Sequence, residues 1–350
     1  MKKDKTAVLY AILAAVCYGV SSPLSKQLLE NLSPVFMAAL LYLGAGLGML
    51  LIHFLPGMKT EQRKEALITG KDLPYVAGMV VLDIAAPILL MIGLTLSNPA
   101  AVSLINNFEI VATTIIALVI FREAVGKRLW IAVFFITVSS ILLSVENLRE
   151  LSFSVGAVFA LLACVCWGFE NNCTRMLSLK DPLQIVIIKG IGSGLGSLLI
   201  AVFTKSVSWD PLPILGALLL GFFAYGLSIY LYILAQRDLG AVRTSAYYAA
   251  APFVGVGLSF VLFYQPVGWS FWIALAMMLL GTYFAAFENH GHRHVHRMMV
   301  HEHRHNHSDG HHNHVHDFPV FGEHSHPHVH EELVHTHQHT PDLHHVHPHS

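Results

Sequence analysis

Residues 35–55 read VFMAALLYLGAGLGMLLIHFL and contain no Asp, Glu, Lys or Arg. A helix rises 1.5 Å per residue, so about 20 such residues cross the ~30 Å hydrocarbon core of a bilayer. Comparable apolar blocks recur at 7–24, 110–120 and 246–263. Apolar residues make up 54% of the chain and charged residues only 12%, about half the charged fraction of a typical soluble domain. These patterns indicate an all-α membrane protein.

Hydropathy windows of about 19 residues divide the chain into ten candidate transmembrane helices. Several joints between them are short and contain proline, as at 31–34, 97–99 and 180–182. All four cysteines fall inside candidate spans, so we expect no disulfide framework. The ten spans are placed at 7–29, 34–55, 73–96, 98–120, 128–145, 154–178, 183–204, 212–235, 242–263 and 268–287.

The basic residues of the loops predict the orientation of the chain. Ten spans put both termini on one side of the membrane, and most loop lysines and arginines then share that side. Arg149 and Lys205 are the clear exceptions. Cytoplasmic loops carry an excess of Lys and Arg, so both termini are expected in the cytoplasm, with the chain in the plasma membrane.

Three pairs of motifs recur with a period of roughly 140–150 residues. They are Cys17-Tyr18-Gly19 with Cys166-Trp167-Gly168, the glycines 44, 46 and 48 with 192, 194 and 196, and Leu73-Pro74 with Leu212-Pro213. Five spans per repeat is an odd number, so the two repeats enter the membrane in opposite senses. Inverted repeats are typical of secondary transporters, whose binding site lies near the bilayer midplane between the repeats.

The Tyr18-Gly19 and Trp167-Gly168 motifs, together with Phe121-Arg122-Glu123 before the fifth span, give the chain a family resemblance. Over residues 6–287 it resembles the drug/metabolite transporter superfamily of the EamA type. The resemblance implies two inverted five-helix repeats, at 6–146 and 152–287, around a central cavity. It also implies a transporter that exports or exchanges metabolites. Glu109 stands close to where this family usually has a proline in the fourth span, whereas Pro252 keeps the proline of the ninth.

Ionisable groups inside spans are costly, so each is a functional hypothesis. Glu109 lies at the centre of its span and suits a proton carrier or cation ligand, or else a buried structural hydrogen bond. Lys189 and Glu170 lie at similar depths, which predicts an ion pair that serves either structure or substrate recognition. The predicted solute and coupling-ion residues are Asp83, Asn107, Glu109, Glu170, Asn171 and Lys189.

Two further motifs in the spans invite a ligand interpretation. Cys166, Glu170 and Cys173 share one helical face and could bind a soft metal, although cysteines are common in membrane helices and no partner helix offers a ligand. Gly190–Gly196 alternates glycine as a nucleotide loop does, but it lacks the required strand-turn-helix context. We interpret these glycines as sites of close helix packing.

All but one of the 24 histidines fall within residues 290–350. This tail is poor in apolar residues and contains prolines, which favours disorder. Repeated His-x-His predicts binding of Zn, Ni or Co, with no cofactor required elsewhere. The expected metal ligands are His301, His303, His305, His307, His324, His326, His328, His330, His335, His337 and His339.

These patterns lead to one leading hypothesis and several alternatives. The leading one is a secondary active transporter of a small solute that uses alternating access and carries a metal-binding tail. A transporter of divalent Zn, Ni or Co and a metal-sensing membrane protein without transport remain open. No Walker motif or nucleophile–base pattern is present, which disfavours a primary pump and an enzyme. The expected partners are the lipid bilayer, a small molecule or ion and transition metals, with no nucleic acid; a homodimer is left open.

Overall fold

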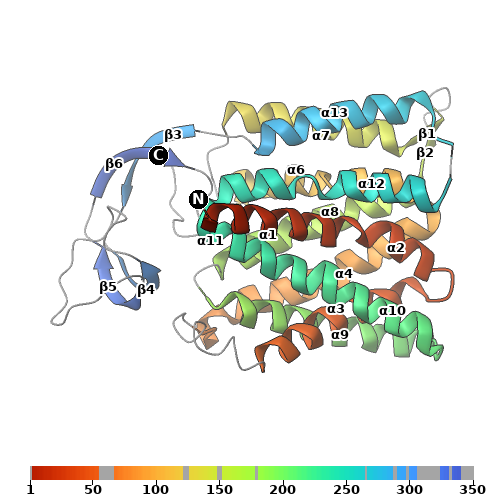
Figure 1. Cartoon of the computed structure of the whole chain (residues 1–350), viewed down its shortest axis with the longest axis horizontal. Helices are drawn as coiled ribbons and strands as arrows, with labels where there is room; N and C mark the ends of the chain where they lie inside the picture. The colour runs from red at the N-terminus through yellow and green to blue at the C-terminus, as the bar shows by residue number, and fades with distance from the viewer. Residues whose placement is uncertain are drawn as a thin grey trace.

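The computed structural model is an α-helical bundle with a short-stranded tail (Figure 1). It describes residues 2–54, 67–120, 126–147, 152–177, 180–264, 266–286, 290–296, 299–305, 324–330 and 333–339.

The first repeat begins with α1 (Lys2–Gly19) and ends with the strand β1 (Val145–Asn147). Between them lie α2 (Ser21–Leu28), α3 (Pro34–His53), the 3-10 turn η2 (Gly70–Asp72), α4 (Leu73–Leu96), α5 (Pro99–Ile105), α6 (Phe108–Ile120) and α7 (Lys127–Ser144). The antiparallel partner of β1 is β2 (Ser152–Phe153), which leads into the second repeat.

The second repeat follows the same plan. It consists of α8 (Val155–Met176), α9 (Pro182–Phe203), α10 (Pro211–Gly221), the π-helical turn η3 (Phe222–Leu227), α11 (Ser228–Tyr248), α12 (Ala251–Leu262) and α13 (Trp269–Ala286).

Proline-containing joints start four of the helices. Ser33 accepts a hydrogen bond from the Phe36 amide at 3.3 Å, and Pro34 follows it as the first helical residue of α3. The same arrangement begins α5, α9 and α10, where Asn98, Asp181 and Asp210 are the capping residues. A polar cap satisfies an orphan amide, and proline at the next position has no amide to satisfy. The joints predicted from sequence are therefore true helix starts.

Nine helical stretches in the described chain are long and apolar enough to cross a membrane, and the shorter α12 adds to them. The tenth crossing arises because α11 reverses direction. A straight helix would separate Tyr232 and Tyr248 by about 24 Å, yet their ring centroids are 5.0 Å apart. α11 therefore ends the eighth span and begins the ninth, which α12 completes. The predicted ten-helix membrane fold is confirmed.

Apolar side chains on the outside of the bundle form its lipid-facing surface. Val119, Leu199 and Val261 remain 68%, 60% and 79% exposed on three different helices. Residues of this kind are stable in contact with lipid tails rather than water. The buried interior is instead rich in alanine, serine and glycine, as expected where membrane helices pack closely.

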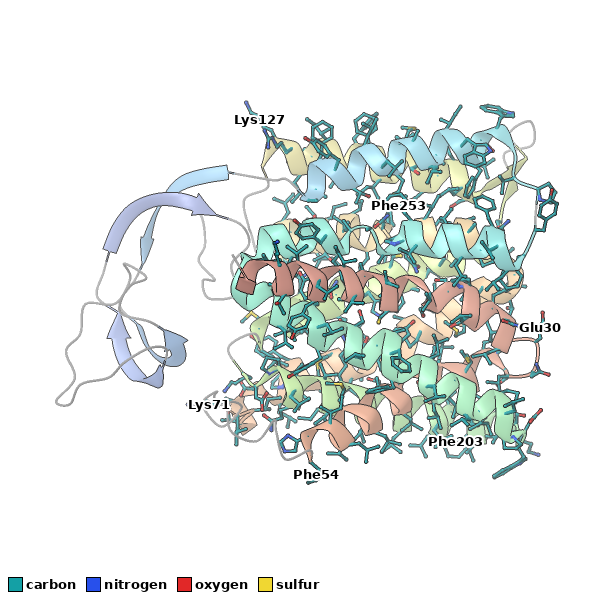
Figure 2. The ribbon with its side chains drawn as sticks, in the orientation of Figure 1. Glu30, Phe54, Lys71, Lys127, Phe203 and Phe253 are labelled. Carbon is teal, nitrogen blue, oxygen red and sulfur yellow. The ribbon has the colours of Figure 1, made fainter. Side chains whose placement is uncertain are left out.

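Labelled charged residues mark the two ends of the bundle. α1 begins and α13 ends at one end, where Lys71 and Lys127 also lie, while Glu30 lies at the other (Figures 1 and 2). Lys26 also lies at that far end and donates to the carbonyl oxygens of Thr95, in the last turn of α4, and Ser97, just after it, at 3.1 and 3.4 Å. This lysine therefore caps the C-terminal end of α4.

Glycines bring the two repeats together. A Cβ atom added to Gly190 of α9 would lie 2.4 Å from the Gly46 amide nitrogen of α3, so only glycine allows this approach. A Cβ on Gly93 of α4 would lie 2.8 Å from the Gly156 carbonyl oxygen of α8. The packing interpretation of the 190–196 glycines is thus confirmed for Gly190, and the second span pairs with the seventh and the third with the sixth.

Four short strands in the tail form two separate antiparallel ribbons. β3 (His290–His296) pairs with β6 (Leu333–His339), and β4 (Met299–His305) pairs with β5 (His324–His330). Composition favours disorder here, whereas the His-x-His alternation has the two-residue period of a strand. An isolated two-stranded ribbon is marginally stable in water, so little free energy separates paired strands from a disordered tail.

Candidate functional site

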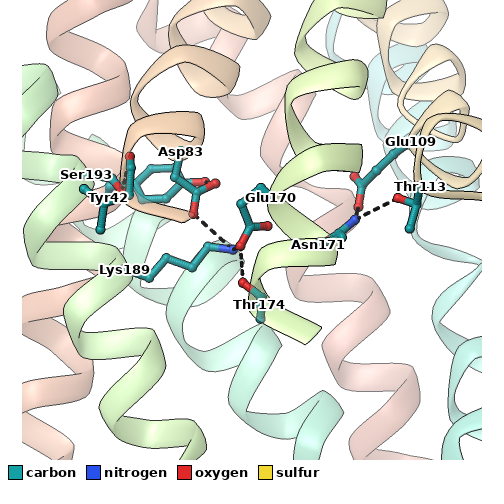
Figure 3. A network of polar contacts seen from close by, with 10 residues as sticks. Tyr42, Asp83, Glu109, Thr113, Glu170, Asn171, Thr174, Lys189 and Ser193 are labelled. Atoms are coloured by element: carbon teal, nitrogen blue, oxygen red, sulfur yellow. Dashed lines mark hydrogen bonds and ion pairs between the residues drawn. The ribbon is translucent and has the colours of Figure 1, made fainter. Parts of the chain in front are cut away.

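A buried ionic cluster joins the third, sixth and seventh spans. The Lys189 ammonium of α9 lies 3.1 Å from Asp83 Oδ2 of α4 and 3.0 Å from Glu170 Oε1 of α8. Figure 3 shows the lysine side chain extending toward both carboxyl groups. The carboxyl side chains are 0% and 1% exposed, and the predicted pairing of Lys189 with Glu170 is present. We call these three residues the ionic cluster.

Neutral partners hold the ionic cluster in place. The Tyr42 hydroxyl of α3 donates to Asp83 Oδ1 at 2.8 Å, and the Thr174 hydroxyl contacts Glu170 Oε1. Buried ion pairs persist only when their remaining lone pairs are hydrogen-bonded, and these two contacts meet that need. Two carboxyl groups nevertheless share a single ammonium. The cluster is one positive charge short of balance when both carboxyls are ionised.

Glu109 forms a second polar contact close to the first (Figure 3). The Asn171 side-chain amide donates to Glu109 Oε1 at 2.6 Å and to Thr113 Oγ1 at 3.2 Å. The structure therefore brings together two residues that the sequence predicted separately. Asn107 does not join them. Its buried amide nitrogen has no hydrogen-bond partner in the described part of the chain.

Four spans depart from regular α-helical geometry near the middle of the bundle. Between α1 and α2, Val20 keeps helical φ and ψ angles, and its amide still bonds to the Val16 carbonyl oxygen at 3.2 Å. Between α5 and α6, the Asn107 amide bonds to the carbonyl oxygen three residues back, that of Leu104, at 3.1 Å. In the second repeat, η3 widens the eighth span, and a turn at 249–250 precedes α12 in the ninth. Sequence reasoning treated all four spans as continuous. Such 3-10 and π-helical adjustments are tolerated at membrane depth where protein or water satisfies the freed backbone groups.

These irregular turns meet at one small pocket between the repeats, which we call the inter-repeat pocket. Its free volume is about 10 Å³, room for about one water molecule. Its lining residues are Tyr18, Gly19, Ser21, Ser22, Ser103, Asn106, Tyr225, Ala251 and Pro252. They come from the first and fourth spans of one repeat and the eighth and ninth of the other. A Cβ on Gly19 would lie 2.4 Å from the Ala251 carbonyl oxygen, so glycine is needed for the first and ninth spans to touch here.

A chain of tyrosine rings connects this pocket to the ionic cluster. The Tyr225 ring lies 5.5 Å from that of Tyr42 and 5.9 Å from that of Tyr18, centroid to centroid. Tyr248 stacks on Tyr18 at 5.8 Å. Tyr42 in turn donates to Asp83, so one aromatic path leads from the pocket wall to the buried charges. Sequence reasoning missed Tyr42 and Tyr225, because a tyrosine within an apolar run gives no distinct signal.

The sequence pattern of the EamA-like transporter family matches residues 5–145 and, a second time, residues 154–287. The chain belongs to the EamA-like transporter family. The resemblance inferred from the motifs is therefore confirmed, and this EamA-like transporter is a multi-pass membrane protein.

Two curated relatives support the assignment. One is described as an uncharacterized transporter of Methanothermobacter thermautotrophicus, 26% identical over 78% of this chain and 83% of the relative. The other, the uncharacterized transporter YyaM of Bacillus subtilis, is 24% identical over 70% of this chain and 82% of the relative. A protein of known crystal structure shares the fold at 16% identity with a TM-score of 0.57, covering 80% of this chain and 95% of its own.

The proposed cysteine site is not assembled in the described part of the EamA-like transporter. No three His, Cys, Asp or Glu side chains there are grouped to hold a metal ion. Glu170, the third member of that motif, is instead occupied by Lys189 at 3.0 Å. Helical spacing places residues on one face, but it does not show which neighbouring side chain takes the carboxylate.

The predicted tail ligands occupy regular register positions. The histidines 301, 303 and 305 on β4 lie opposite the histidines 328, 326 and 324 on β5. Those at 335, 337 and 339 on β6 lie opposite the histidines at 294, 292 and 290 on β3. His330 lies opposite Met299, and His307 falls outside the described residues.

Proposed function

We propose that this EamA-like transporter is a secondary active transporter that exports or exchanges a small solute by alternating access, with the solute bound in the inter-repeat pocket. One observation carries the proposal. Irregular turns in spans of both inverted repeats meet at a pocket with a partly polar lining. The interface between inverted repeats, near the bilayer midplane, is where secondary transporters bind their solutes.

The geometry of the pocket supports alternating access. Its wall is divided between Ser22, Ser103 and Asn106 on one repeat and Tyr225 and Ala251 on the other. Rocking one repeat against the other therefore changes which face of the membrane the pocket reaches, while the solute contacts stay near the midplane. The glycine contact between Gly19 and the ninth span gives this motion a tightly packed pivot.

The ionic cluster and Glu109 are our candidates for coupling. Buried carboxyl groups that lack a full complement of positive charge favour the arrival of a proton or a cation. The Tyr42–Tyr225 contact links Asp83 to the pocket, so a change in charge at the cluster alters the packing of the pocket wall. Solute binding and proton binding are thereby energetically linked through one aromatic path.

The histidine-rich tail supports a second candidate activity, binding of Zn, Ni or Co at the cytoplasmic face of the plasma membrane. The register pairs histidine with histidine at six positions of the two ribbons. The cytoplasmic location rests on the lysines at that end of the bundle, and a reporter that fluoresces only outside the cytoplasm when fused at residue 350 would contradict it. In this proposal the metal regulates an organic-solute transporter. The competing proposal is that the transported solute is itself the metal.

Counterflow in liposomes tests the main proposal. A solute-induced thermal-shift screen first identifies a ligand, and liposomes preloaded with that ligand should then accumulate it in labelled form. Asn106→Leu removes a polar pocket group and should abolish accumulation. Gly257→Ala is the matched control, because no atom lies within 4 Å of a Cβ added there. A ligand that binds without counterflow would favour a sensor over a transporter.

A further inference from the structure

We infer that the solute of the inter-repeat pocket is a small organic cation that bears a protonated amine. The inference rests on the proposed function and names the chemistry of its solute. Three properties of the pocket and its surroundings carry it: a deficit of positive charge, tyrosine rings in the wall, and buried acceptors without partners.

The charge around the pocket is unbalanced toward the negative. The described side chains at the middle of the bundle include three carboxyl groups, those of Asp83, Glu109 and Glu170, but a single ammonium, that of Lys189. That ammonium already contacts two of them. Glu109 lies one helical turn beyond pocket-lining Asn106, and its amide donates to the Asn106 carbonyl oxygen at 3.1 Å. A cation in the pocket relieves this deficit, whereas an anion adds to it.

The aromatic wall suits a cation rather than a neutral polar solute. Tyr18 and Tyr225 both line the pocket, with ring centroids 5.9 Å apart in an edge-to-face arrangement. The negative face of a tyrosine ring attracts an ammonium group within about 6 Å, and the attraction grows when water is excluded. Tyr225 is buried, so a cation that reaches its ring is largely desolvated.

Unsatisfied acceptors point to an amine with N–H groups. Asn106 Oδ1 and Ser103 Oγ are buried and have no hydrogen-bond partner in the part of the chain that the structure describes. Both residues line the pocket, and they are 9% and 2% exposed. A buried polar atom left unpaired costs free energy that a donor on a ligand would recover. An ammonium offers only donors, whereas a carboxylate offers only acceptors and leaves Asn106 Oδ1 unpaired.

The pocket is nearly closed in this conformation. Its free volume is about 10 Å³, room for about one water molecule, so an amine enters only when the repeats move apart. A short aliphatic amine needs less of this widening than a large multi-ring cation.

Three probes with a common butyl group separate the possible head groups. Butylammonium, butanol and pentanoate would each be titrated at constant ionic strength against the purified full-length protein, with thermal stability as the readout. We expect saturable stabilisation by butylammonium at millimolar concentration and none by the other two. Equal stabilisation by butanol, saturable stabilisation by pentanoate, or no stabilisation by butylammonium would overturn the inference.

Pocket variants add a second readout. Tyr225→Leu should weaken butylammonium binding about 10-fold to 30-fold, as expected for loss of a desolvated cation–π contact, while Tyr225→Phe should stay within about threefold. Asn106→Asp, which keeps the acceptor and adds negative charge, should bind at least as tightly as the wild type. Weaker binding by a folded Asn106→Asp protein would count against the inference, and the wild-type series remains decisive if a variant does not fold.

Transport distinguishes this inference from the function on which it rests. Counterflow of a labelled amine that butylammonium inhibits would support both. Counterflow of an anionic or neutral solute without inhibition by butylammonium would retain the transporter and overturn the amine. Saturable amine binding that depends on Asn106, in a protein that shows no counterflow, would support the pocket chemistry and contradict transport.

Discussion

Lys189 is the residue on which the ionic cluster depends, because its ammonium contacts both Asp83 and Glu170. Removing one partner of a buried ion pair leaves an uncompensated charge and costs roughly 3–5 kcal/mol. Lys189→Met should therefore lower the thermal stability of the detergent-solubilised protein strongly at neutral pH. Asp83→Asn, which leaves Lys189 paired with Glu170, should lower it much less.

The loss in Lys189→Met should also depend on pH. Protonation removes the unpaired carboxylate charges, so the stability difference from the wild type should shrink as the pH falls. A difference that stays constant with pH, or an equal loss in both variants, would mean that the cluster is held by packing rather than charge.

A single substitution at Glu109 tests whether this residue couples transport to a proton gradient. Its Oε1 atom accepts a hydrogen bond from Asn171 at 2.6 Å, and glutamine keeps a carbonyl oxygen at that position while losing the titratable proton. Glu109→Gln should therefore abolish proton-gradient-driven uptake in liposomes but leave solute exchange largely intact. Normal pH-dependent uptake by this variant would remove Glu109 from the coupling mechanism.

At the scale of elements, the contact between α3 and α9 fixes the repeats against each other. A Cβ on Gly190 would lie 2.4 Å from the Gly46 nitrogen, whereas Gly257 of α12 has no atom within 4 Å of its added Cβ. Overpacking of this kind costs about 1–3 kcal/mol. Gly190→Ala should thus lower the melting temperature while Gly257→Ala leaves it unchanged or raises it. Equal melting temperatures would show that the helices separate easily at Gly190.

The positions of the helices were largely predictable from the sequence, whereas the irregular turns within them were not. Hydropathy located the spans because each apolar run is bounded by a polar joint, such as Ser33-Pro34, which the structure uses as a helix cap. The irregular turns at Val20 and Asn106 depend on contacts with other spans. The pair Lys189–Glu170 could be predicted from depth, but the third member, Asp83, required knowledge of which helices pack together.

At the scale of the whole molecule, the bundle and the tail are separable. The ten spans end with α13 at Ala286. Truncation after residue 289 should therefore preserve a folded membrane domain and remove nearly all Zn or Ni binding. Imidazoles bind metal only when neutral, and the ordinary histidine pKa is about 6.5, so metal binding by the full chain should fall steeply as the pH drops from about 7.5 to about 5.5.

Metal stoichiometry measured on both forms checks this prediction, and liposome flux separates the solute classes. An organic solute should still be transported by the truncated protein without its metal response. A metal solute should show lower apparent affinity after truncation. Undiminished metal binding by the truncated protein would refute the assignment to the tail and direct attention to Cys166 and Cys173.

The central claim is that one pocket between the inverted repeats faces each side of the membrane in turn. Ser22→Cys, in a background without the four native cysteines, places a single thiol in the lining of the inter-repeat pocket. Ser140→Cys is the matched control, buried in α7 away from the pocket. The measurement is labelling by a membrane-impermeant thiol reagent in right-side-out and inside-out vesicles. Labelling of Ser22→Cys from both sides, with Ser140→Cys unlabelled, is the predicted result; labelling of Ser22→Cys from one side only would contradict alternating access.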